Sequence, residues 1–140
     1  MKYLLFLLIM SGVSFQTLAK SNPDAIIGTW LTDEKNAKIE IYKEGNKYHG
    51  KIVWLEDSPE ELLDTENPDP KLRNRPLFGL KLLEGFEYEG GEWKNGEIYD
   101  PQSGKTYACY IKLNKPDQLY VRGYIGVSLL GRTSYWDKVD

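Results

Sequence analysis

Residues 119–136 read LYVRGYIGVSLLGRTSYW. In the first half of this stretch, apolar side chains alternate with polar or aromatic ones, Leu119, Val121 and Ile125 against Tyr120, Arg122 and Tyr124. A period of two predicts a β-strand with one buried face. Gly126 and Gly131 interrupt the pattern, and residues 132–136 predict a second strand. The stretch therefore indicates a sheet protein.

The rest of the chain continues this pattern of short strands divided by turn residues. We expect strands over residues 26–33, 37–43, 47–55, 80–89, 92–94, 97–100 and 105–113. Gly85 predicts a bulge, and Asn95-Gly96 predicts a two-residue hairpin turn because both residues tolerate positive φ. About eight strands at this spacing, without helical periodicity, are typical of an antiparallel barrel or sandwich.

A barrel is the better prediction, because closure leaves no exposed strand edge. The predicted fold class is all-β, a single eight-stranded antiparallel up-and-down barrel. One long loop, residues 56–79, interrupts it. Ser58 and Pro59 predict a short helix over residues 58–63, and the length of the loop suggests a lid or another functional element.

The amino terminus has the pattern of a signal peptide. Lys2 precedes an apolar run over residues 3–10, and Thr17-Leu18-Ala19 supplies small residues for cleavage. The apolar run is too short to span a bilayer, which takes about 20 residues. We therefore expect a signal peptide over residues 1–19 and one barrel domain over residues 20–140, in the periplasm or outside the cell, with no stable membrane insertion.

Charge and cysteine content exclude several classes of function. The net charge of −3 comes without a long basic run, so nucleic acid and anionic membrane surfaces are poor candidate partners. Cys109 is the one cysteine and His49 the one histidine, which leaves too few ligands for zinc. Cys109 is expected to pack as a small hydrophobe, and His49 to lie at the surface. Residues 64–69 are rich in carboxylates but do not fit a calcium loop. We expect no metal and no cofactor.

Three ordered motifs resemble a known family. They are NPDPKLRNRPLFGLKLLEGF at 67–86, GEIYDPQSGKTY at 96–107 and VRGYIG…GRTSYW at 121–136, after an amino-terminal GTW. The chain resembles the bacterial exported domain-of-unknown-function family 2147. This resemblance implies a small β-barrel of the calycin type, and it implies no particular activity.

A second resemblance is to lipocalins and fatty-acid-binding proteins. In these proteins a Gly-x-Trp lies on the first strand, and an arginine near the last strand packs on the tryptophan. Trp30 with Arg122 or Arg132 is similar to this arrangement. The resemblance implies that Trp30, Arg132 and Trp136 close the barrel and are structural.

The four arginines of the chain are Arg73, Arg75, Arg122 and Arg132. If they converge on the barrel mouth, they would bind a carboxylate or phosphate head group. Alternatively, they pair with the acids of the same motifs, Asp64, Asp69, Asp100 or Asp137, and pin the long loop to the barrel. The structural role is favoured.

Our leading hypothesis is a non-catalytic binding protein for a small, largely apolar molecule with an acidic head. Its cavity would be lined by Trp54, Tyr107 and Tyr124, with Arg75 and Arg122 as polar groups and the long loop as a lid. In one alternative the aromatics fill the barrel and the loop docks another envelope protein. In a second alternative the protein is a hydrolase of envelope material, although no catalytic motif appears and no catalytic residue is assigned.

Overall fold

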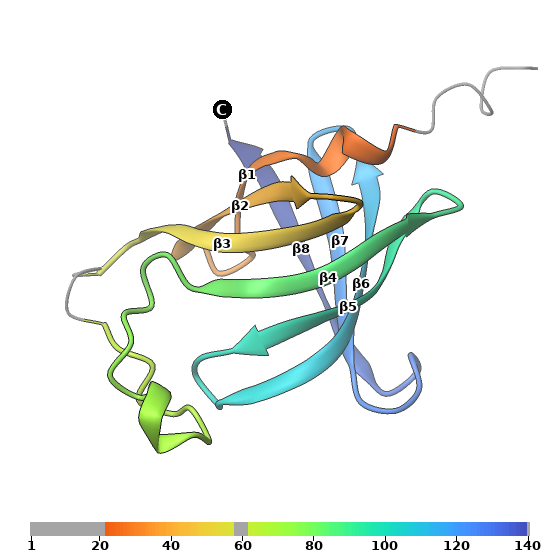
Figure 1. Cartoon of the computed structure of the whole chain (residues 1–140). Coiled ribbons are helices and arrows are strands. Elements are labelled where there is room, and N and C mark those ends of the chain that lie inside the picture. Colours follow the sequence, from red (N-terminus) through yellow and green to blue (C-terminus); the bar gives the residue numbers. More distant parts are fainter. Residues whose placement is uncertain (1–21, 58–61, 140) are drawn as a thin grey trace, which may run out of the picture.

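The computed structural model describes residues 22–57 and 62–139, which form a closed barrel of eight antiparallel strands (Figure 1). Each strand pairs with the next along the chain, and β8 pairs with β1. The strands are β1 (Gly28–Leu31), β2 (Ala37–Glu44), β3 (Lys47–Leu55), β4 (Lys81–Glu89), β5 (Glu92–Asp100), β6 (Lys105–Lys115), β7 (Gln118–Tyr124) and β8 (Gly131–Val139). The predicted fold class is confirmed. The predicted signal peptide over residues 1–19 lies outside the described residues, as do residues 58–61 of the predicted short helix.

One predicted hairpin is wrong. Asn95-Gly96 does not turn the chain, and β5 runs through both residues. Asn95 adopts φ +63°, and two residues of β5 stand opposite Tyr110 alone, so the pair forms a β-bulge. Gly96 is required there because a Cβ would lie 2.4 Å from the ring of Phe86 on β4. The bulge predicted at Gly85 is confirmed by the register shift between β3 and β4 and by φ +80°.

One end of the barrel is filled and covered. The 3₁₀ helix η2 (Pro23–Ile26) lies across this end (Figure 1). The indole Nε1 of Trp30 donates to the carbonyl of Ile26, and that of Trp93 donates to the carbonyl of Pro23, each at 2.9 Å. Beneath η2 the core is made of fully buried side chains, one from each of the strands β1 to β7: Trp30, Ile41, Tyr48, Phe86, Trp93, Ile111 and Leu119.

The other end of the barrel carries four connections. These are the β1–β2 turn at 32–36, the long β3–β4 loop, the β5–β6 turn at 101–104 and the β7–β8 turn at 125–130. The β3–β4 loop contains a second 3₁₀ helix, η3 (Pro70–Leu72). Odd-numbered connections of an up-and-down barrel share one end, so the topology gathers these four segments. None of the described helices is long and apolar enough to cross a membrane.

Candidate functional site

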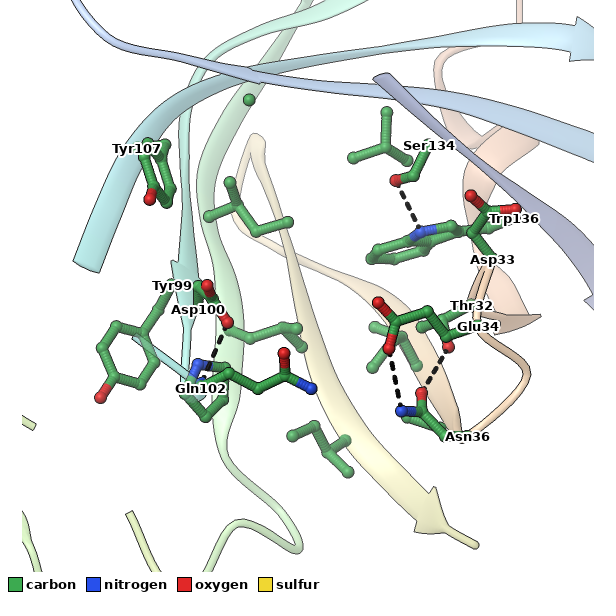
Figure 2. Close-up of a pocket in the computed structure, with 18 of the residues that line it drawn as sticks. Thr32, Asp33, Glu34, Asn36, Tyr99, Asp100, Gln102, Tyr107, Ser134 and Trp136 are labelled. Carbon is green, nitrogen blue, oxygen red and sulfur yellow. Dashed lines mark hydrogen bonds between the residues drawn. The ribbon is translucent and has the colours of Figure 1, made fainter. Parts of the chain in front are cut away.

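The four connections surround a cavity of about 870 Å³ that occupies the unfilled half of the barrel. Its walls are mostly aliphatic, and the aliphatic side chains come from five strands and the β3–β4 loop: Ala37, Ile39, Ile52, Leu55, Leu77, Leu82, Ile98 and Val121. Trp136 extends into this space, and its indole Nε1 donates to Ser134 Oγ at 3.1 Å (Figure 2). Leu119, the β7 partner of Trp136, is fully buried and outside the wall, so Trp136 marks where the filled half ends.

The mouth of the cavity is polar and acidic. On one side Thr32 Oγ1 donates to Asn36 Oδ1, and Asn36 Nδ2 donates to Glu34 Oε2, each at 3.2 Å (Figure 2). On the other side Asp100 accepts hydrogen bonds from the backbone N–H of Gln102 and from Ser103 Oγ. The lining carboxylates of the described chain are Asp33, Glu34, Glu56, Asp57 and Asp100. They face a single lining base, Arg132, so the mouth carries net negative charge.

A buried carboxylate holds the described part of the β3–β4 loop against the barrel. Asp64 is fully buried; its Oδ2 accepts from Arg75 Nε and Asn67 Nδ2 at 2.8 Å, and its Oδ1 accepts from the hydroxyl of Tyr99 on β5. Burial raises the pKa of Asp64, but the hydrogen bonds from Tyr99, Asn67 and Arg75 outweigh burial and lower the pKa overall. Burial and the bond to Asp64 raise the pKa of Tyr99 to about 12.

The β5–β6 turn makes a second contact with this loop. Gly104 has φ +73°, and a Cβ on it would lie 1.9 Å from the carbonyl oxygen of Glu66. Only glycine lets the two backbones approach so closely. The motifs at 67–86 and 96–107, which are separate in the sequence, therefore belong to one structural unit at the mouth of the cavity.

Of the residues predicted to line a cavity, Tyr107 and Tyr124 do line it, and their contact with a ligand stays a prediction. Trp54, Arg75 and Arg122 were also predicted to line the cavity, and this prediction is wrong because none of them lies in its wall. Trp54 is 37% exposed and stacks with Lys38, whose Nζ lies 5.0 Å from the ring centroid. Arg75 is held by Asp64, which is the structural alternative considered for it. Arg122 donates to the carbonyl of Ser128 and to Thr133 Oγ1, because its position on β7 points away from the interior.

The predicted closing residues divide between the two ends of the barrel. Trp30 lies in the filled half, but the cation over its ring is Lys138, with Nζ 5.8 Å from the centroid, and not an arginine. Arg132 is at the opposite end, 83% exposed and 4.0 Å from Glu34. Trp136 lines the cavity. The closing role predicted for Arg132 is therefore wrong, because the start of β8 lies at the open end. The closing role of Trp136, which borders the filled half, stays a prediction.

The lone cysteine and histidine do not form a reactive pair. Cys109 is buried as predicted, and burial raises the pKa of its thiol to about 12. The surface position predicted for His49 is wrong, since it is 8% exposed and its Nδ1 accepts from the amide of Gly85 at 3.1 Å. Among residues 22–57 and 62–139, no group of three or more His, Cys, Asp or Glu side chains is placed to hold a metal ion.

Sequence reasoning missed the aliphatic wall and the acidic mouth. The signal for the wall was present, because Ile39, Ile52 and Ile98 occupy inward positions in strands whose apolar and polar side chains alternate. The same alternation continues into the filled half, so periodicity does not show which inward residues face empty space. The signal for the mouth was that Asp33, Glu34 and Asp100 lie at connections that share one end.

A closed up-and-down barrel with one filled end and a cavity at the other defines a lipocalin-like barrel, a fold that suits small-molecule binding. Residues 28–138 match the family described as "Uncharacterized protein conserved in bacteria (DUF2147)", and the chain belongs to this family. Its structure is similar to that of HP1028 from Helicobacter pylori, which is described as belonging to the lipocalin family. The TM-score is 0.76 and the sequence identity 26%, over 82% of this chain and 83% of HP1028. Comparison with curated proteins gave no match. The predicted resemblances to this family and to the lipocalin fold are confirmed, whereas the tryptophan–arginine packing that the second resemblance implied is not found.

Proposed function

We propose that this protein is a non-catalytic carrier or receptor for a small, largely apolar molecule held in the barrel. The observation that carries the proposal is the cavity of about 870 Å³ with aliphatic and aromatic walls. Cavities that hold small molecules in proteins measure about 300–1,000 Å³ and have such walls with a few polar groups. The polar groups here are at the mouth, where the polar end of an amphiphile would meet solvent.

The division of the barrel into two halves supports this proposal. The filled half supplies a continuous core that includes Trp30, Phe86 and Trp93. The other half presents Ile52, Ile98 and other apolar side chains to a space in which water finds few hydrogen-bond partners. An apolar ligand there would remove this surface from water, at about 25 cal/mol per Å².

The chemistry of the described side chains favours binding over catalysis. A nucleophile needs a base within hydrogen-bond reach, and Cys109 is protonated, buried and outside the cavity wall. His49 is occupied by the Gly85 amide. The hydrolase alternative therefore receives no support from either residue.

The mouth favours a different polar head from the one the sequence suggested. We expected an acidic head because Arg75 and Arg122 were predicted to line the cavity, and neither does so. With five carboxylates and one arginine at the described mouth, the proposed ligand has a neutral or positively charged head.

We further propose that the protein works in the periplasm or outside the cell. This part rests on the signal-peptide pattern of residues 1–19. Fractionation of an expressing bacterium tests it: release of a shortened chain by osmotic shock supports export, and retention of the full chain in the cytoplasm contradicts it.

The binding proposal is tested with the neutral apolar dye N-phenyl-1-naphthylamine, which fluoresces when it leaves water. Ala37 lines the cavity near its mouth, so Ala37→Trp places an indole in the space a ligand would occupy. Ala108 is exposed on β6 and outside the wall, so Ala108→Trp is the matched control. We expect saturable binding by the wild type and by Ala108→Trp, and an affinity reduced about tenfold or more in Ala37→Trp. The proposal is contradicted if the wild type shows no saturable binding, or if both variants lose the same amount of affinity for the dye.

A further inference from the structure

The β7–β8 turn, residues 125–130 (IGVSLL), is an exposed apolar tip beside the mouth of the cavity. The four most exposed large apolar side chains of the described chain are here: Leu129 at 87%, Leu130 at 68%, Ile125 at 64% and Val127 at 57%. The tip contains no charged residue. Contiguous apolar side chains at this exposure indicate a surface that another apolar phase covers.

The backbone of the tip is suited to an apolar phase. The amide of Ile125 donates to the carbonyl of Leu130, that of Leu130 to Val127, and that of Val127 to Ile125, at 2.9–3.2 Å. The carbonyl of Ser128 accepts from Arg122 Nε at 2.8 Å. Peptide groups that are already paired lose little when water is removed, whereas unpaired ones cost several kcal/mol in hydrocarbon. The turn can therefore leave water with these hydrogen bonds intact.

The side chains behind the tip are of the kinds that favour a lipid head-group region. Arg132 follows the tip after Gly131 and is 83% exposed. Tyr124 precedes the tip, and its ring lies 6.2 Å from that of Tyr110, which is 6.0 Å from Tyr120. Tyr135 on β8, 41% exposed, lies 5.8 Å from Tyr120. Tyrosine and arginine have apolar bodies and polar ends, and both are favoured where hydrocarbon meets water.

The tip is continuous with the cavity. Ile125 and Leu130 line the cavity as well as the outer surface, whereas Val127 and Leu129 do not line it. A phase that covers the tip would therefore border the opening of the barrel. This position favours a bilayer over a protein partner, because a bilayer is also a source or destination for an apolar molecule that enters or leaves the cavity.

We propose that residues 125–130 insert reversibly into the interfacial layer of a phospholipid bilayer and dock the mouth of the barrel on the membrane. The carboxylates of the mouth, Asp33, Glu34 and Asp100 among them, would be repelled by anionic lipids, so the proposed surface is a neutral, zwitterionic one. Docking is peripheral and spans nothing. Transfer of a ligand between bilayer and cavity rests on the proposed function, whereas docking itself does not.

Flotation with phosphatidylcholine vesicles tests the docking. The variant Val127→Ser with Leu129→Ser removes two exposed apolar side chains that do not line the cavity, so it should bind the naphthylamine dye as the wild type does. Ile27→Ser, 39% exposed at the filled end, is the control for loss of an apolar side chain elsewhere. We expect the wild type and Ile27→Ser to float, with partition nearly independent of salt, and the double variant to partition about tenfold less or weaker.

A labelled variant gives a second readout. Leu129→Cys is labelled with a nitrobenzoxadiazole dye, and Cys109 stays unlabelled because it is buried. Vesicles should brighten and blue-shift this dye, and the same label on Ile27→Cys should not respond. At low salt, vesicles containing phosphatidylglycerol should change the fluorescence of this dye less than vesicles of phosphatidylcholine alone.

Three results overturn the proposal. The first is a wild type that stays with the soluble fraction while the labelled tip gives no response. The second is a double variant that floats as well as the wild type. The third is a wild type that is dimeric in sedimentation while the double variant is monomeric, which would assign the tip to a second copy of this chain. Dye binding, measured in parallel, separates these results from failure of the proposed function.

Discussion

Arg75 and Asp64 form an ion pair across the β3–β4 loop, with 2.8 Å between Nε and Oδ2. The carboxylate is fully buried, while the arginine side chain is 36% exposed. Through Tyr99, which donates to the same carboxylate, the pair connects the loop to β5. The arginine that the sequence offered as a ligand contact therefore has a structural role.

Arg75→Ala should lower the free energy of unfolding by about 2 kcal/mol, because it leaves a buried carboxylate with two hydrogen bonds and no cation. Urea unfolding followed by tryptophan fluorescence measures this change. Arg132→Ala is the control, since a side chain that is 83% exposed should contribute less than about 0.5 kcal/mol. If the two variants are equally stable and Arg75→Ala binds the dye more weakly, Arg75 contacts the ligand and the structural role is wrong.

Acid should destabilise the protein through Asp64 and Asp24. The hydrogen bond from Tyr48 lowers the pKa of Asp24, and the bonds described above lower that of Asp64. Because both folded-state pKa values lie below the unfolded value of about 3.9, their contribution is present above that pH and is lost as pH falls through the folded values. Urea unfolding at a series of pH values should therefore show stability falling below about pH 4. Asp64→Asn should be less stable at neutral pH and should show a shallower fall; a fall as steep as in the wild type contradicts this account.

Gly104→Ala should be much more destabilising than Gly126→Ala. The two glycines have nearly the same φ, +73° and +75°, so the backbone strain of alanine, about 1 kcal/mol, should be similar at both. A Cβ at Gly126 meets nothing within 4 Å, whereas one at Gly104 collides with the carbonyl of Glu66. Thermal and urea unfolding should show an additional loss of about 1–3 kcal/mol for Gly104→Ala. Similar free energies of unfolding for the two variants would mean that the β5–β6 turn can move away from the β3–β4 loop without loss of stability.

The acidic mouth should discriminate between head groups of opposite charge. Decylamine should displace the naphthylamine dye at lower concentration than decanoate, which has a chain of the same length. The double variant Asp33→Asn, Glu56→Gln should bind decylamine with an affinity about fivefold lower, since each exposed charge pair contributes a fraction of a kcal/mol. Asp117→Asn, in the turn at the filled end, should change nothing. Tighter binding of decanoate would restore the acidic ligand that the sequence suggested.

The amino-acid sequence by itself determined the barrel. Alternation with period two and turn residues at short intervals are local properties, and they are sufficient for the ends of the strands within about three residues. The hairpin at Asn95-Gly96 is the exception, and its cause is not local. Phe86, on a neighbouring strand, occupies the space that a Cβ at position 96 would need, and the same two residues form a bulge.

Only the tertiary structure decided the site. Alternation places Ile39, Trp136 and Trp30 alike inside the barrel, but closure of the sheet and the position of η2 determine that the first two border a cavity and the third lies in the filled half. In the same way, Arg75 and Arg122 have the chemistry of anion-binding residues. Their direction from the backbone, and the acid that Arg75 meets, depend on contacts between segments far apart in the chain. Residue type and spacing follow from the sequence, whereas the empty space and the partner of each charge follow from packing.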